Sequence, residues 1–190
     1  MNQRLKKQFE FIKTLDEMKS IFRMTNLIGS ERKENDAEHT FHIATMAVIL
    51  HEYADEEVDL EHVIKLLLFH DIVEIDAGDT FAYDKEHNKS KLDREKKAAE
   101  HLYGLLPEDQ AEEFKALWYE FEAQETPESK FALVMDRLQP VYLNYLNGGG
   151  TWKEHHVTKE EVLHRIMPFE KASKTLYEFT LHIIDEFFED

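Results

Sequence analysis

The segment LEHVIKLLLFHDIVEI, residues 60–75, limits the possible folds more than any other part of the chain. Its apolar residues occupy most of the circumference of a helix, and Asp59 is a favourable N-cap at its start. A helix that is apolar on most sides must be covered by other elements. We therefore expect it at the centre of the molecule, with Gly78 ending it.

The rest of the sequence predicts helices around this segment. Apolar residues recur at helical spacing over residues 4–22, and Asp36 is expected to cap the helix that follows. Thr126-Pro127 is a start signal, whereas Pro140 suggests a kink or break. Further helices are expected near residues 89–105, 108–123, 127–146, 158–165 and 169–188, and loops over 25–36, 76–90 and 147–150.

Composition agrees with an all-α fold. Only six Gly and four Pro occur among 190 residues, of which 42% are hydrophobic and 33% charged, too few turn residues for an all-β protein. Neither a repeat nor a linker divides the chain. The sequence therefore predicts one domain over residues 1–190, a compact all-α bundle of about seven to nine helices. The C-terminal helices, residues 158–188, are expected to pack on a core within about residues 20–146.

Charge and cysteine content exclude several classes of function. The chain has no cysteine, so thiolate metal sites, thiol nucleophiles and disulfides are impossible. A net charge of −17 repels nucleic-acid polymers and anionic membranes, which leaves small anions as the expected ligands. The N-terminal segment is charged and lacks an apolar signal core, and the apolar runs are too short to span a bilayer. We expect a cytoplasmic protein.

Isolated titratable residues inside apolar helices mark the candidate site. His70-Asp71 interrupts the central apolar segment, and a buried carboxylate is costly without a partner. The dipeptide alone leaves two interpretations open, a buried pair that joins helices or a metal site. His39, early in the helix that Asp36 opens, and Asp136, in the apolar segment FALVMDRLQPVYL, favour the metal site. Histidines with carboxylates suit a divalent cation.

The order His…His-Asp…Asp resembles the HD-domain superfamily of metal-dependent phosphohydrolases. The similarity extends over about residues 20–146 and is strongest to the small single-domain branch that includes bacterial 5′-deoxynucleotidases. It rests on KENDAEHT (33–40), HDIVEIDAGD (70–79) and MDRLQP (135–140). The resemblance implies an HD-domain bundle in which one divalent metal (Mn, Co, Mg, Fe, Ni or Zn) is held by His39, His70, Asp71 and Asp136.

The resemblance also implies roles near the metal. Glu74 is expected to position or activate the attacking water, and Asp79 to orient water or assist the leaving oxygen. Arg23 resembles an arginine that contacts the substrate phosphate, although Met24 follows it where the family often has tryptophan. Lys33 is a further candidate for substrate binding, or else a solvated loop charge. His42 is expected in the core or behind a metal ligand.

These observations predict an enzyme that hydrolyses nucleoside 5′-monophosphates to nucleoside and phosphate. The alternatives are an HD phosphohydrolase that acts on another phosphate ester or nucleotide, and a non-catalytic metal-containing module that binds a ligand. The expected partner is a small phosphorylated substrate, with neither nucleic-acid polymer nor membrane. A homodimer is also expected from the resemblance, with the aromatic C-terminal helix as a possible interface.

Overall fold

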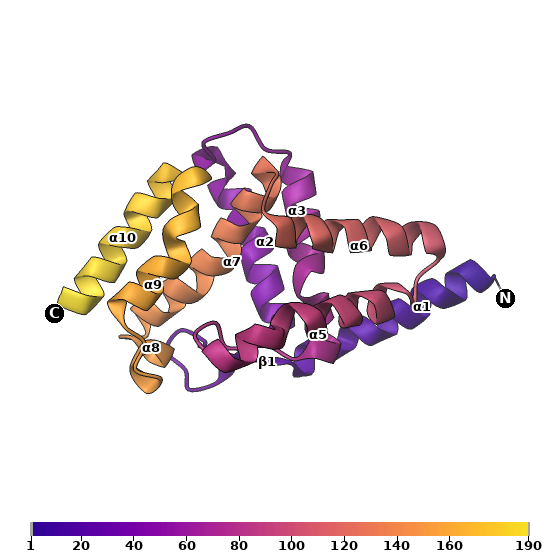
Figure 1. The fold of residues 1–190 in the computed structure, drawn as a ribbon, viewed down its shortest axis with the longest axis horizontal. Coiled ribbons are helices and arrows are strands. Elements are labelled where there is room, and N and C mark those ends of the chain that lie inside the picture. Colours follow the sequence, from indigo (N-terminus) through magenta and orange to yellow (C-terminus); the bar gives the residue numbers. More distant parts are fainter. Residues whose placement is uncertain (1, 190) are drawn as a thin grey trace.

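A computed structural model of the chain describes residues 2–189. Its central element is α7, Pro127–Leu146, which is surrounded by other helices (Figure 1). On one side α7 packs against α2 (Asp36–Leu50), α3 (Leu60–Phe69) and α6 (Glu108–Ala123). On the other side it contacts α8 (Gly150–Glu154), α9 (Lys159–Ile166) and α10 (Lys174–Glu189).

The N-terminal region differs from the helix and loop predicted for it. Helix α1 spans Gln3–Leu15 and is followed by a 3₁₀ turn, Asp16–Ser20. Strands β1 (Phe22–Asn26) and β2 (Lys33–Asn35) then form an antiparallel hairpin. The prediction of one helix over 4–22 was wrong because the α-helix ends at Leu15 and a 3₁₀ turn follows. The predicted loop over 25–36 was wrong because it contains most of the paired strands, and strand pairing is not revealed by helical periodicity.

The start of α2 is also shifted from the prediction. Asn35, and not Asp36, is the N-cap, and its side chain accepts a hydrogen bond from the backbone N–H of Glu38. The Glu38 carboxylate accepts one from the N–H of Asn35 in return, which completes a capping box. Asp36 is thereby free to turn its carboxylate into the interior, where its side chain is fully buried.

The segment 60–75 is not one continuous helix. α3 begins after its N-cap Asp59, as predicted, but ends at Phe69. A 3₁₀ turn over His70–Val73 and the short α4, Glu74–Ala77, follow before Gly78 ends the run with a φ of 75°. The tighter turn changes the direction in which successive side chains project. This irregular backbone carries the His-Asp pair.

The second half of the chain follows the prediction more closely. α5 spans Lys85–Tyr103, and α6 follows Pro107. α7 begins after its N-cap Thr126, with Pro127 in the first turn. The helix continues through Pro140, so the predicted break there is wrong. Within the described residues 2–189, eight helices have at least eight residues, and α4 and α8 are single turns.

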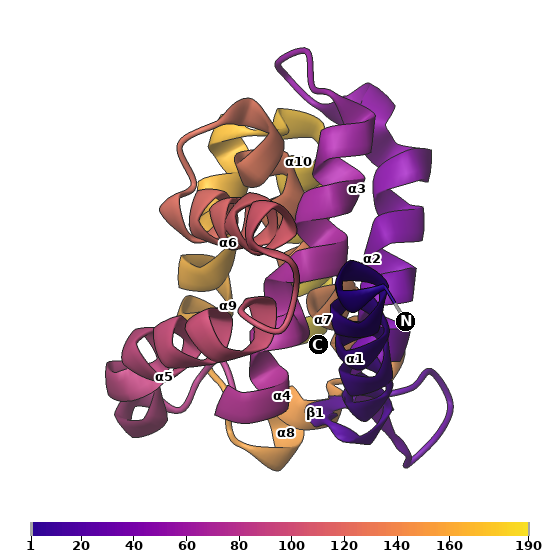
Figure 2. The ribbon, with the colours of Figure 1, turned by 90° about the vertical axis from the view of Figure 1, so that its right-hand side faces the viewer.

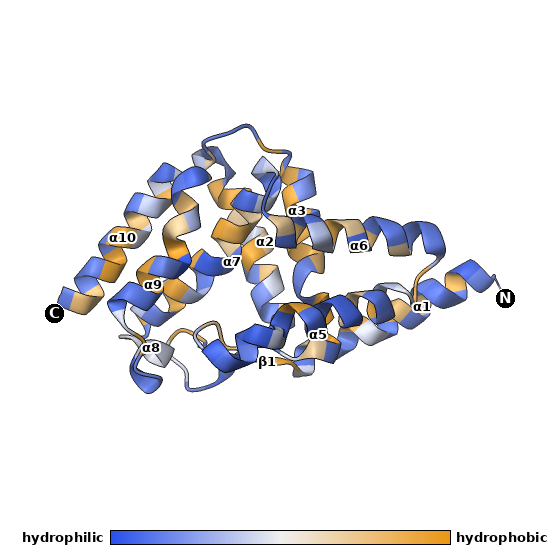
Figure 3. Ribbon diagram, in the orientation of Figure 1, coloured by the Kyte–Doolittle hydropathy of each residue, from blue (hydrophilic) through white to orange (hydrophobic). Residues whose placement is uncertain are grey.

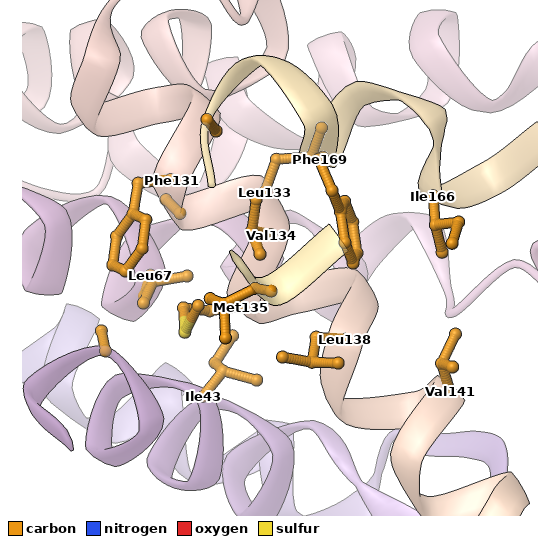
Figure 4. Close-up of a cluster of buried hydrophobic side chains, with 14 of the residues drawn as sticks. Ile43, Leu67, Phe131, Leu133, Val134, Met135, Leu138, Val141, Ile166 and Phe169 are labelled. Carbon is orange, nitrogen blue, oxygen red and sulfur yellow. The ribbon is translucent and has the colours of Figure 1, made fainter. Parts of the chain in front are cut away.

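Two apolar cores hold these helices together. The larger one surrounds α7, and Figure 4 shows Met135, Leu138 and Phe131 from α7 beside Leu67 and Ile43. The smaller one joins α1, α5 and α6 through residues such as Phe11, Leu102 and Trp118. Figure 3 shows much apolar colour on α3 and α7, while α5 is mostly hydrophilic. In the part of the chain that the structure describes, helices are too short or too polar to cross a membrane.

Asn144 fixes the connection between α7 and α8. Its Nδ2 donates to the carbonyl of Pro140, and its Oδ1 accepts from both the backbone N–H and the hydroxyl of Thr151, at 2.8 Å each. Gly150 leaves room for this contact, since a Cβ there would lie 2.6 Å from the same oxygen. Asn144 is only 4% exposed, so water cannot replace it as the partner.

We predict that Asn144→Ala lowers the free energy of unfolding by about 1–3 kcal/mol, because two buried donors of Thr151 lose their acceptor. Urea denaturation monitored by circular dichroism measures the change. The matched variant Thr151→Val removes only the hydroxyl and should cost less. Equal losses in the two variants would show that the backbone bond from residue 151 contributes nothing.

Candidate metal centre

Four side chains from three segments meet at one point inside the molecule. His39 comes from α2, His70 and Asp71 from the 3₁₀ turn after α3, and Asp136 from α7. His39 Nε2 lies 3.1 Å from Asp136 Oδ1, and His70 Nε2 lies 3.0 Å from Asp71 Oδ1. One ligand atom from each of the four residues lies within 4.8 Å of all the others. The structure thus brings together the four residues that the sequence singles out.

Both imidazoles are held so that Nε2 points into this cluster. His70 Nδ1 donates to the carbonyl of Leu67 at 2.9 Å, and because a carbonyl only accepts, the proton must be on Nδ1. His39 Nδ1 donates to Gln139 Oε1 at 3.2 Å. Each ring therefore keeps the lone pair of Nε2 free in its neutral form. Outer hydrogen bonds of this kind orient histidine ligands in metal sites.

Gln139 connects several buried groups behind His39. Its Nε2 donates to Glu34 Oε1 at 2.6 Å and to His42 Nδ1 at 3.1 Å. Gln139 is fully buried and Glu34 is 2% exposed, so these bonds are shielded from water. His42 therefore lies behind a ligand residue rather than within the cluster. Through Gln139, this chain of hydrogen bonds holds the His39 ring in place.

The cluster has the donors and the electrostatics of a divalent metal site. His70 Nε2 is buried and has no hydrogen-bond partner among the described residues. Burial alone would lower the pKa of His70, but the carboxylates of Asp71 and Asp136 raise it to about 10. Negative charge around the two rings thus attracts a cation, a proton or a metal ion. Two imidazoles and two carboxylates suit a borderline or hard divalent ion.

Arg23 is surrounded by carboxylates next to this cluster. Its Nη1 lies 2.9 Å from Asp71 Oδ2 and 3.4 Å from Asp36 Oδ1. Glu74 Oε2 and Asp79 Oδ1 are both 3.9 Å away from the same nitrogen. The Arg23 side chain is 11% exposed, so these pairs are screened little by solvent. The arginine offsets part of the buried negative charge.

Glu74 and Asp79 lie close to the cluster but outside the group of four. Burial, together with the Asp71 carboxylate, raises the pKa of Glu74 well above its usual range. Burial also raises the pKa of Asp79, although Arg23 opposes this shift. Glu74 Oε2 is buried without a hydrogen-bond partner in the described chain. Both carboxyl groups line a cavity that also contains His70, Asp71 and Asp136.

Lys33 lies elsewhere. Its Nζ donates to the carbonyl of Met24 at 2.6 Å and pairs with Glu154 at 3.2 Å, and it is not among the residues that line the cavity. Met24 does line it, next to Arg23. The substrate-binding role of Lys33 stays a prediction, and these contacts give it a structural use between the hairpin and α8.

Sequence reasoning missed several residues around the centre. Asp36 was interpreted only as a helix cap, yet burial and the Asp71 carboxylate raise its pKa to about 7. Lys91 and Glu95, one turn apart in α5, were not named as candidates either, but both line the cavity. Gln139 was not singled out. A glutamine inside the apolar segment of α7 was the one available signal, and it parallels the signal that revealed Asp136.

Comparison with known proteins agrees with this geometry. A family model described as HD domain matches residues 15–176, most of the chain. The chain belongs to the HD domain family. This confirms the resemblance on which the sequence interpretation rests, and with it the helical fold. An HD domain with this cluster of two histidines and two aspartates has the ligands to hold a divalent metal.

Individual HD-domain proteins are similar over much of the chain. The Xenopus laevis protein named 5′-deoxynucleotidase HDDC2 is 31% identical over 137 residues, which are 72% of this chain and 67% of that protein. The Bos taurus protein of the same name is 29% identical, and the chain spans 63% of its length. A crystal structure described as a predicted metal-dependent phosphohydrolase from Magnetospirillum magnetotacticum is 50% identical, with a TM-score of 0.93 over 98% of this chain and 93% of that one.

We predict that the protein binds one divalent ion per chain and that Asp71→Ala abolishes this binding. In the parent protein, Mn²⁺ at about 1,000 times its Kd should stabilise the fold by about 4 kcal/mol through mass action, and the variant should show no such gain. Elemental analysis and thermal unfolding with and without Mn²⁺ measure both effects. Asp76→Ala, on the outer side of α4, is the control and should behave like the parent. Full metal occupancy in Asp71→Ala would remove Asp71 from the ligand set.

Proposed function

We propose that this protein is a metal-dependent phosphohydrolase that converts nucleoside 5′-monophosphates to nucleoside and inorganic phosphate. The observation that carries the proposal is the cavity in which three of the four clustered residues, His70, Asp71 and Asp136, stand beside Glu74 and Asp79. A site that only held a structural metal would need neither of these extra carboxylates. The relatives named 5′-deoxynucleotidase support the same class of substrate.

The lining of the cavity supports a nucleotide over a simpler phosphate ester. Its walls also contain four aromatic side chains, Phe81, Tyr83, Phe121 and Trp152, of which Phe121 lies beside His70 with ring centroids 4.5 Å apart. Aromatic faces of this kind stack on nucleobases of any identity. The net charge of −17 disfavours polymeric nucleic acid, so the proposed substrate is a single nucleotide.

In this proposal, His39, His70, Asp71 and Asp136 hold one divalent ion, of which Mn²⁺, Co²⁺, Mg²⁺, Fe²⁺, Ni²⁺ and Zn²⁺ are candidates. Such an ion, when bound, polarises a phosphoryl oxygen and makes water a better nucleophile. Glu74 has a free, buried oxygen and is the base that accepts a proton from the attacking water. It directly follows the 3₁₀ turn that carries His70 and Asp71, so its position is fixed by the same backbone.

Asp79 and Arg23 complete the proposed reaction. The oxygen of water forms a bond to phosphorus, and the bond from phosphorus to the 5′ oxygen breaks. The leaving oxygen takes a proton, which we assign to Asp79, since burial raises its pKa and it lines the cavity. Arg23, rather than Lys33, is the phosphate contact that we propose, because of the two only Arg23 faces the cavity. Its planar guanidinium suits a phosphate group.

We predict that the parent protein releases phosphate from a nucleoside 5′-monophosphate after metal stripping and addition of Mn²⁺, Co²⁺ or Mg²⁺. Glu74→Gln preserves shape but removes the proton acceptor, so kcat should fall by about 100-fold or more while metal content is unchanged. Arg23→Ala should instead raise KM through loss of a phosphate contact. Phosphate release and elemental analysis on both variants separate the two roles.

Three outcomes would redirect the proposal. Hydrolysis by Glu74→Gln at the parent rate would make Glu74 a structural residue. If the parent protein loaded with each metal releases phosphate from other small esters or nucleotides but not from monophosphates, the substrate class is wrong. Absence of any phosphate release would favour a non-catalytic module that binds a ligand beside its metal. The cytoplasmic location stays a prediction from sequence.

We further propose a homodimer formed through α1, α2 and α3 rather than through the C-terminal helix. An apolar groove of about 600 Å³ lies between these elements, and Phe41 at its edge is 73% exposed. Phe9 and Ile12 of α1 and Ile49 of α2 are also more than half exposed. In α10, by contrast, several apolar side chains are buried against the chain itself, including Leu176, Ile183 and Ile184.

Charge supports a second copy of the chain as the partner on this surface. α1 carries exposed Lys6 and Lys7 in a strongly acidic protein, while the segment after α2 carries exposed Glu52, Glu56 and Glu57. Figure 2 shows α1 near the lower end of α2 and this segment at its upper end. A two-fold axis across α2 would bring the lysines of one copy towards the acidic segment of the other.

We predict that Phe41→Asp converts the dimer to a monomer, because a carboxylate buried in an apolar interface is costly. Light scattering coupled to size-exclusion chromatography measures the mass directly. Ile28→Asp, on the hairpin, is a control that should leave the mass unchanged. Dissociation by Phe179→Asp, which alters the exposed apolar position on α10, would instead place the interface on the C-terminal helix.

A further inference from the structure

The proposed active site must bind a dianion within a strongly acidic cavity. Six carboxyl side chains line it: Asp71, Glu74, Asp79, Glu95, Glu122 and Asp136. Three cationic side chains line it as well: Arg23, Lys91 and Arg165. A phosphate monoester adds close to two further negative charges. Its affinity therefore depends on which of the three cations can reach the phosphate beside the metal cluster.

Arg23, the phosphate contact proposed above, shares its charge with neighbouring carboxylates, and Arg165 lies on a different helix, α9. Arg23 already has close contacts with Asp71 and Asp36, at 2.9 and 3.4 Å. Arg165 stands at another part of the wall, where its charge acts on Tyr83 and Arg137.

Lys91 is placed differently. It lies on the inner side of α5, one turn before Glu95 and two turns before Ala98, both of which are buried. Its Nζ lies 3.4 Å from a carboxylate oxygen of Glu95, which is a long ion pair, and its side chain is 38% exposed. The ammonium can therefore move and is accessible from the cavity. Burial lowers the pKa of Lys91, but Glu95, Glu74 and Asp71 together raise it, which keeps the side chain charged.

Lys91 and Arg23 line the same cavity from different elements, α5 and β1. Figure 2 shows α5 and β1 on either side of α4, the short helix that begins with Glu74. A substrate phosphate in this cavity would thus meet cations from two elements, Arg23 from β1 and Lys91 from α5. A compact ammonium on a flexible stem can follow charge that shifts between phosphoryl oxygens during reaction.

We propose that Lys91 is a substrate-binding residue whose ammonium contacts the phosphate from the α5 side, and that Glu95 is the positioning residue that orients it. The inference rests on the proposed function and adds a second phosphate contact to it. Glu95 suits this role because it is 3% exposed and is fixed by the packing of α5. The competing interpretation is that Lys91 only offsets the charges of Glu95 and Glu122.

The test compares Lys91→Met with the Lys91→Met/Glu95→Gln double variant, using Mn²⁺-loaded protein. Calorimetric titration with inorganic phosphate should give about 10- to 100-fold weaker binding for Lys91→Met, the usual effect of losing a charged hydrogen bond. The double variant should remain equally weak, because the phosphate contact is still missing. A residue that merely offsets Glu95 predicts recovery of phosphate affinity in the double variant, since both charges are then removed together.

Kinetics with a nucleoside 5′-monophosphate provide a second readout. Lys91→Met should raise KM by a similar factor while metal content stays at the parent level, and Lys91→Arg should restore part of the loss. Lys97→Met, on the exposed side of the same helix, is the matched control and should change neither value. Glu95→Gln should raise KM by less than Lys91→Met, because the ammonium remains.

The outcomes separate this inference from the function on which it rests. If the parent protein hydrolyses the nucleotide and Lys91→Met matches it in KM and phosphate affinity, Lys91 does not bind phosphate and the function stands. A Lys91→Met variant that loses thermal stability but keeps phosphate affinity would likewise overturn the inference. If the parent protein binds phosphate through Lys91 but hydrolyses no ester, the inference stands and the function fails.

Discussion

The structure depends on the neutralisation of negative charge that is buried at one place. Asp36, Asp71, Glu74 and Asp136 lie within one region of a helical core, where an unpaired carboxylate is unfavourable. Arg23 and the two imidazoles offset part of this charge, and a divalent ion would offset more. The same buried carboxylates that destabilise the fold make the cavity attract cations. Fold and chemistry are therefore coupled through a single electrostatic requirement.

Hydrogen bonds between buried polar groups decide how rigidly the site is held. Gln139 links His39, His42 and Glu34, so three segments of the chain share one side-chain amide. The carbonyl of Leu67 fixes His70 from the last turn of α3. Because the Nδ1 donor of each ring has a partner in a low-dielectric setting, both rings are oriented before any ion arrives.

Much of the site could be predicted because its polar residues lie within apolar stretches of the sequence. His70, Asp71 and Asp136 stand in apolar segments, where polar residues require an explanation. Lys91 and Glu95 gave no such signal, since a lysine and a glutamate four residues apart are common on solvated helices. The hairpin over residues 22–35 was missed for a related reason: strand pairing depends on contacts between segments, and a short polar loop carries no periodicity that reveals it.

The four clustered side chains come from segments that are far apart in the sequence, and this separation affects folding. His39 and Asp136 are 97 positions apart in sequence but within hydrogen-bond distance in space. A bound ion therefore acts as a crosslink that closes long loops of chain, comparable in effect to a disulfide in a protein that has no cysteine. The unfolded chain cannot assemble such a set of ligands, so affinity for the ion arises only as the helices dock. The folded site, rather than the unfolded chain, therefore selects which divalent metal is bound.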